Sequence, residues 1–294
     1  MDGPQIPEEY AAYPRGYGVG PFGPAPRRVR MDAIGDAWNI LKSDWGTWVG
    51  TTLVLIGISI AASAPQFLYS FIRGATSRPA SDPFLQPSDV LAVTAVLGCI
   101  THWVLGIVTA GVQKLGLKKV RGEYGTFSDI FSFQGRLGQL ALAELILCPI
   151  ALLPYGFGVA ATIYFKGTDV FTLSMIAVGF QLIGALLASF VYAWVVFVPL
   201  LVLDGGMTVG EAYRASFDAA GGKILPIFGL LFVVGFLASV GACACLVGLL
   251  FTAPLYYVTR AVLYHDFFRR VSVAPSAPSN IGAEPPTAPW DKTT

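Results

Sequence analysis

Few side chains of this chain could carry chemistry, since 13% of its residues are charged and only two are histidines. His102, Glu144 and Arg260 each fall inside a long apolar stretch. Ionisable groups are costly within a bilayer, so those found there are the first candidates for function. Glu144 and Arg260 are predicted at similar depths from one membrane surface and could pair. Two interpretations stay open: a structural ion pair with a hydrogen-bonded histidine, or a path for protons or a solute.

A second candidate is a stripe of small and polar residues in the apolar run 171–203, which includes Gln181 and Ser189. Such a stripe could line a cavity, although stripes of small residues more often mark close helix packing. A similar four-residue spacing, from Thr94 through His102 to Ala110, points His102 at protein rather than at lipid. Together these patterns nominate one intramembrane polar site, made of His102, Glu144, Gln181, Ser189 and Arg260.

The sequence lacks the motifs of a metalloprotease helix, a phosphate-binding loop or a nucleophile elbow. His265 and Asp266 are adjacent, so on a helix they diverge and make a poor chelate. Cys243 and Cys245 alone do not complete a metal site. The four cysteines lie in or beside apolar runs, which is not the pattern of a disulfide framework. We therefore expect no enzyme, no cofactor and no metal, and a net charge of +1 gives no reason to expect nucleic acid.

The elements that must position these residues are membrane-spanning helices, because 54% of the chain is hydrophobic. A bilayer core needs about 20 apolar residues in a helix. Six runs meet this length: 48–72, 90–112, 137–165, 171–203, 224–240 and 246–268. The fourth is too long to cross upright, so it must tilt, bend near Pro199 or project from the bilayer. The predicted fold is an all-α membrane bundle of about six helices, with a tight hairpin at 241–245.

Lysine and arginine fix the predicted orientation. If the N-terminus is inside, all 19 lysines and arginines except Arg73, Arg78 and Lys166 fall in inner segments. Residues 1–30 and 270–294 are rich in proline and carry no apolar core, so they read as disordered cytoplasmic tails around a membrane domain at 31–269. We expect a multi-pass protein of a bacterial plasma membrane with both termini cytoplasmic.

The stretch 208–222 is a polar interruption between two apolar runs. Thr208 and Glu211 have the spacing of a capping box, and Arg214 and Asp218 could pair one turn apart. The apolar face consists of Val209, Ala212, Tyr213, Phe217 and Ala220. These features predict a short amphipathic helix at the inner membrane surface that leads into a spanning helix.

Similar stretches precede two other spans. Aligning Asp36 with Glu211 also aligns Trp38 with Tyr213, and a weaker copy begins at Thr126. The chain can thus be read as a repeat of three units, starting near Asp32, Thr126 and Thr208, each with one surface helix and two spans. Alternatively, any capped helix before a span would look like this.

Four stretches carry a resemblance to a known family: "DAWNILKSDWGTWVG", "RGEYGTFSDIF", "PLLVLDGGMTVGEAYRASFDAAGGKILPIFGLL" and "APLYYVTRAVLYHDF". They resemble a largely uncharacterised group of bacterial multi-pass membrane proteins that is similar to the membrane domain of some glycerophosphoryl diester phosphodiesterases. The resemblance covers roughly 32–268 and is most specific at 204–226. It implies a helical bundle in a bacterial plasma membrane. It implies no activity, because no soluble stretch is long enough to hold the phosphodiesterase domain.

The expected function is a non-catalytic membrane domain that binds lipid or a partner membrane protein, possible partners including a second copy of the chain. The surface helices, a basic inner segment at 114–136 and the lack of catalytic groups favour it. The alternative is a transporter of a small solute or lipid, favoured by the repeat, the prolines and the polar stripe. A water-filled cavity bounded by His102, Glu144, Gln181 and Ser189 would favour transport, and a solid, dry bundle would favour binding.

Overall fold

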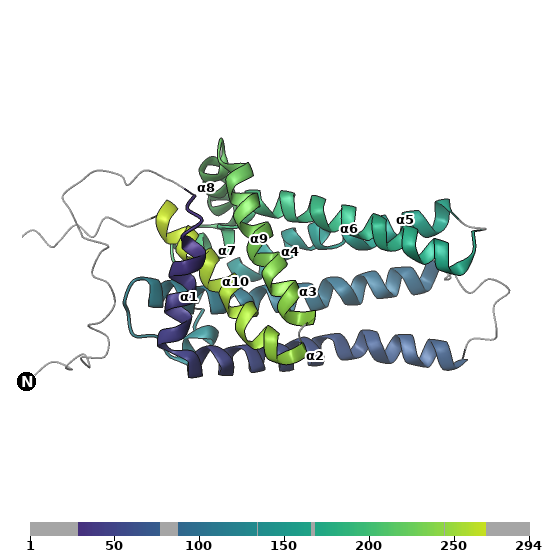
Figure 1. Cartoon of the computed structure of the whole chain (residues 1–294), viewed down its shortest axis with the longest axis horizontal. Coiled ribbons are helices and arrows are strands. Elements are labelled where there is room, and N and C mark those ends of the chain that lie inside the picture. Colours follow the sequence, from purple (N-terminus) through teal and green to yellow (C-terminus); the bar gives the residue numbers. More distant parts are fainter. Residues whose placement is uncertain (1–28, 77–87, 134, 166–167, 244, 269–294) are drawn as a thin grey trace, which may run out of the picture.

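The computed structural model describes residues 29–76, 88–133, 135–165, 168–243 and 245–268. The predicted tails lie almost wholly outside this part of the chain. Within it every regular element is a helix, which confirms the all-α prediction (Figure 1). In chain order the helices are α1 (Ala33–Ser43), α2 (Trp45–Thr76), α3 (Ser88–Val120), η2 (Phe127–Phe131), α4 (Leu137–Ala151), α5 (Leu153–Tyr164), α6 (Val170–Val195), α7 (Val198–Leu203), α8 (Val209–Ala220), α9 (Ile224–Cys243) and α10 (Cys245–Phe267).

Five of the six predicted spans are long and apolar enough to cross a membrane. They are Trp45–Ile72, Val93–Val120, Leu137–Ala161, Phe171–Leu203 and Ile224–Gly241. The sixth predicted span corresponds to α10, which is not among them, so the membrane-protein class is shown but the count of six is not. α10 carries the buried Arg260 and packs on α9, α3, α1 and α2. In Figure 1 the α9 and α10 pair crosses obliquely and stops well short of the far ends of α2 and α3.

Proline breaks two of the long apolar runs. The run 171–203 divides into α6 and α7, and Pro199 lies in the first turn of α7. Proline lacks the N–H that would continue the α6 ladder, so the helix breaks beside Pro199, where a bend was one of the three predicted alternatives. The run 137–165 likewise divides into α4 and α5 at Leu152, between Pro149 and Pro154. These breaks let one apolar run present different faces to different neighbours.

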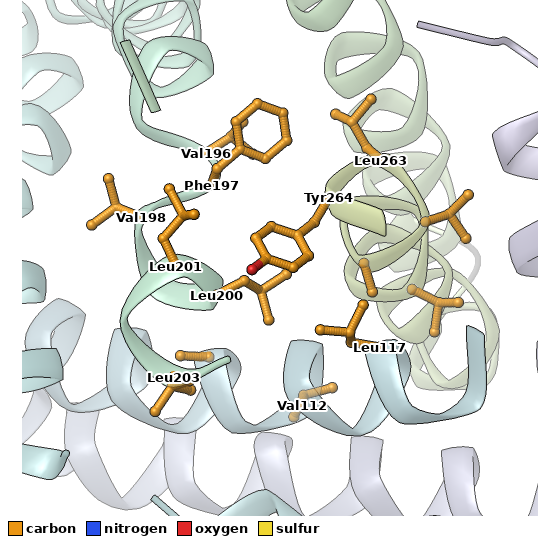
Figure 2. Close-up of a cluster of buried hydrophobic side chains, with 14 of the residues drawn as sticks. Val112, Leu117, Val196, Phe197, Val198, Leu200, Leu201, Leu203, Leu263 and Tyr264 are labelled. Carbon is orange, nitrogen blue, oxygen red and sulfur yellow. The ribbon is translucent and has the colours of Figure 1, made fainter. Parts of the chain in front are cut away.

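The short helix α7 forms the centre of the hydrophobic core. All six of its side chains are buried. Figure 2 shows α7 facing Val112 and Leu117 of α3 on one side and Leu263 and Tyr264 of α10 on another. α8 and α4 also pack on α7. Enclosure on several sides explains why the sequence of α7 is apolar without any amphipathic pattern.

The two ends of the molecule differ. At one end, here called the packed end, α1, α7 and α8 gather around the beginning of α2 and the end of α3 (Figure 1). At the other, the far end, two helix pairs extend, α2 with α3 and α5 with α6. Large apolar side chains at the far end are exposed: Phe67 at 73%, Phe71 at 74% and Phe171 at 71%. In a bilayer, lipid tails would cover these surfaces.

Helices form at the three positions where the sequence predicts surface helices, as α1, η2 and α8. The weaker copy that begins at Thr126 is η2, a 3₁₀ helix in which only Ile130 is fully buried, while Phe127 and Phe131 are exposed. On α8, Phe217 of the predicted apolar face is 46% exposed, and its ring lies 5.7 Å from that of Trp194 between centroids. Ser216 beside it is buried and donates to the Trp194 carbonyl at 2.8 Å.

Candidate functional site

Glu144 and Arg260 are both buried, on α4 and α10, at 3% exposure each. They interact electrostatically, but no contact within 4.0 Å joins them among the ion pairs of the described residues. The Glu144 carboxylate instead lies against Gly106 of α3, where a Cβ atom would collide with it. Gly106 lies on the predicted stripe of four-residue spacing that contains His102, and its lack of a side chain leaves the space that the Glu144 carboxylate occupies.

Tyrosines hold the Arg260 guanidinium. Its Nη2 donates to the Tyr192 hydroxyl at 2.7 Å and to the Val196 carbonyl at 3.2 Å. The guanidinium also lies over the rings of Tyr192 and Tyr256, at 5.0 and 5.7 Å from their centroids, which stabilises a desolvated cation. Its Nε is buried without a partner. These contacts are those of a cation that ties α10 to the end of α6.

His102, Gln181 and Ser189 do not join this buried pair. His102 is half-buried on α3, and no described residue hydrogen-bonds to its ring. Gln181 is exposed and packs over Gly158 of α5, where a Cβ atom would meet its Nε2 at 2.6 Å. Ser189 is exposed and donates to Ala185 of its own helix at 2.7 Å. The stripe on α6 therefore packs against α5, and the five predicted residues do not line one enclosed cavity.

The α8 motif is arranged as its spacing predicts. The Glu211 carboxylate accepts hydrogen bonds from the Thr208 backbone N–H at 2.9 Å and from the Thr208 hydroxyl at 2.8 Å. These bonds lower the pKa of Glu211. Tyr213 donates its hydroxyl to the Ala143 carbonyl at 3.0 Å and so anchors α8 on α4. Arg214 is exposed and makes no ion pair with Asp218 or any other described residue, so that predicted pair does not form.

The equivalent residues on α1 have other roles. Asp36 pairs with Arg30 at 3.2 Å, and Arg30 also reaches Asp266 at the end of α10 at 3.1 Å. Trp38 is 37% exposed and lies at the surface. Its ring packs edge-on against Trp45. Asp36 thus links α1 through Arg30 to the end of α10, while Trp38 is partly exposed at the surface.

An ionic clasp that sequence reasoning missed ties the packed end together. Arg121 makes two parallel bonds to the Asp204 carboxylate, at 2.6 and 2.8 Å, and Tyr264 donates to the same carboxylate at 3.0 Å. This clasp joins the ends of α3, α7 and α10. Fork-shaped pairing of this kind is the strong form of ion pair.

The basic segment 114–136 is used in the same way. Lys118 pairs with Asp129 and Lys119 with Asp44, both at 2.7 Å. Lys114 and Arg136 donate to backbone carbonyls at 2.5 Å. The segment therefore fastens elements of this chain to one another.

The ion pairs of the packed end shift the pKa values of Asp44, Asp129 and Arg121. Partial burial raises the pKa of Asp44, but hydrogen bonds from Lys119 and Thr47 outweigh it and the net shift is downward. Burial of Asp129 is likewise outweighed by Lys118 and Thr126, so its pKa is lowered. The hydrogen bond to Asp204 raises the pKa of Arg121. All three shifts hold these groups in their charged forms.

An open groove lies beside α1, bounded by Trp38, Lys42, Trp45 and Phe251, with a volume of about 460 Å³. Trp45 stacks on Phe251 of α10 with ring centroids 4.4 Å apart, and Trp38 meets Trp45 edge-on at 6.2 Å. The Lys42 ammonium lies 5.3 Å from the centre of the Trp38 ring. The groove combines an apolar wall with one cation. Its two tryptophans and lysine are visible in the sequence, but Phe251 joins them only through the packing of α10.

In the described part of the chain, no group of three or more histidine, cysteine, aspartate or glutamate side chains could hold a metal ion.

Comparison of the chain with known protein families, with curated proteins and with solved structures finds no match.

Proposed function

We propose that this protein is a non-catalytic membrane domain that binds lipid at one surface of a bacterial plasma membrane. The groove beside α1 carries the proposal, because it is an aromatic and cationic surface next to the first residue of an apolar span. Tryptophan favours the boundary between headgroups and hydrocarbon, and lysine extends its charge towards the headgroups. The proposed similarity to the membrane domain of glycerophosphoryl diester phosphodiesterases fits this function.

The proposed orientation puts the packed end at the cytoplasmic surface. Its support is the excess of lysine and arginine in the connections at that end. The test is a single cysteine introduced at Ser81 in a chain whose four native cysteines are replaced. It should react with an impermeant thiol reagent in intact cells. Labelling only after lysis would reverse the orientation.

The experiment for lipid binding is native mass spectrometry of the protein extracted gently from its own membrane. A stoichiometric lipid adduct is expected. A clean protein mass would count against lipid binding, and a second polypeptide would transfer the function to a partner protein or to a second copy of the chain.

Transport is the alternative, and one observation favours it: Glu144 is a buried carboxylate near the buried cation Arg260 without an ion pair between them. Against it, Gln181 and Ser189 are exposed and contact α5 or their own helix. Proteoliposomes decide between the two. Proton or solute flux that Glu144→Gln abolishes, while lipid adducts persist, would establish transport.

A further inference from the structure

The groove beside α1 is open to the surroundings and has the volume of a ligand site. Its volume of about 460 Å³ falls in the range of about 300–1,000 Å³ that small-molecule sites occupy. Three aromatic rings, from Trp38, Trp45 and Phe251, make a continuous wall in which neighbouring centroids lie 6.2 and 4.4 Å apart. An apolar wall of this extent suits the glycerol backbone and first acyl carbons of a lipid.

Lys42 supplies a charge that this chain does not neutralise with a described carboxylate. The acidic residue nearest in sequence, Asp44, is bound by Lys119 at 2.7 Å. Arg30, at the other end of α1, is bound by Asp36 and Asp266. Lys42 is exposed, and its ammonium lies only against the Trp38 ring in the contacts of the described residues. An ammonium so placed can donate to a phosphate.

The charge of the groove argues against a headgroup that carries a cation. Choline or an ammonium in the groove would lie beside the Lys42 ammonium, which is 5.3 Å from the centre of the Trp38 ring, and like charges repel. None of the described residues that line the groove is a carboxylate. The site therefore presents one positive charge and no partner for a second cation, which matches a headgroup of net negative charge.

We propose that the groove binds one anionic phospholipid, with its phosphate at the Lys42 ammonium and its glycerol and acyl carbons along Trp45 and Phe251. This inference rests on the proposed lipid-binding function and specifies its site and lipid class. Position supports it, because Trp45 is the first residue of the apolar span Trp45–Ile72 and so lies where phosphates lie in a bilayer.

The test uses the full chain in nanodiscs of phosphatidylglycerol or phosphatidylcholine and counts retained lipids by native mass spectrometry. The wild type should prefer phosphatidylglycerol by about five- to tenfold, the contribution of one basic residue near a phosphate. Lys42→Gln should abolish that preference, and Lys42→Arg should keep it. Lys42 is exposed, so both variants should melt as the wild type does. The matched control is Arg214→Gln, which removes another exposed cation with no described ion pair and should leave the preference unchanged.

Four outcomes would overturn the proposal. Equal retention of the two lipids would remove the headgroup selectivity while leaving the proposed function intact, whereas no retained lipid at all would remove both. An equal loss in Arg214→Gln would show diffuse attraction instead of a site. If lipid is retained only after residues 1–28 are deleted, then that segment, and not a lipid, occupies the groove in the full chain.

Discussion

At the packed end, all six side chains of α7 are buried, whereas at the far end Phe67, Phe71 and Phe171 each exceed 70% exposure. Both ends are apolar in sequence, so hydrophobicity alone does not distinguish them. What distinguishes the packed end is its ionic contacts, such as the clasp of Arg121 with Asp204. Glycines, in contrast, allow close helix contact at both ends. Within a membrane, lipid tails are as apolar as leucine, so specific packing has to come from such residues.

The largest effect should come from filling a helix contact at the packed end. A Cβ atom at Gly111 of α3 would collide with the backbone carbonyl of Ile130, whereas a Cβ atom at Gly98 of the same helix meets nothing within 4 Å. Gly111→Ala should lower the free energy of unfolding by about 3 kcal/mol because a backbone neighbour cannot rotate away. Gly98→Ala should be neutral or slightly stabilising. Unfolding in mixed micelles with SDS measures both, and equal stabilities would contradict the difference between the ends.

The clasp should give the next largest effect. Arg121→Ala and Asp204→Ala should each cost about 2–3 kcal/mol, because each leaves a part-buried charge without its partner. The double variant should cost less than the sum, with a coupling of about 2 kcal/mol. Arg214→Ala, at an exposed cation without a described ion pair, should change stability by at most about 0.5 kcal/mol. Additive costs at Arg121 and Asp204 would mean that the clasp does not hold the end together.

Features of this fold that depend on residues close in the sequence can be predicted, whereas contacts between residues distant in the sequence cannot. The capping of α8 by Glu211 was predicted correctly, and a bend at the helix break beside Pro199 was among the predicted alternatives, because a three-residue spacing and a missing N–H act locally. The Arg121–Asp204 clasp joins residues 83 positions apart, and only the folded chain brings them together.

Long-range packing limits the prediction of α8 in the same way. The apolar pattern does not indicate that Ser216 is buried, because a buried hydroxyl needs a hydrogen-bond partner, here the Trp194 carbonyl, that only the folded chain supplies. The groove, too, depends on Phe251 of α10, which no pattern near Trp38 indicates.

Acidification should loosen the packed end. The pKa of Asp44 is lowered in the folded protein, so its ion pair with Lys119 stabilises the fold above the unfolded value of about 3.9. That stability is lost as the pH falls below about 4 and through the folded pKa. Asp44→Asn should cost about 1–2 kcal/mol at pH 7 and narrow the difference in stability between pH 6 and pH 3. Asp218→Asn, at an exposed residue of α8, is the control and should leave that difference unchanged.

The smallest effect should be the coupling free energy between Glu144 and Arg260. Arg121 and Asp204 touch, whereas Arg260 is held by Tyr192 and Val196 and makes no ion pair with Glu144. In a cycle of Glu144→Gln and Arg260→Ala, each single variant should destabilise, since Arg260→Ala removes the bonds to α6. The coupling should stay below about 1 kcal/mol, because neither change removes the contacts of the other residue. A coupling as large as that of Arg121 with Asp204 would show that the two charges meet in the membrane, and would restore the ion pair that their similar depths predict.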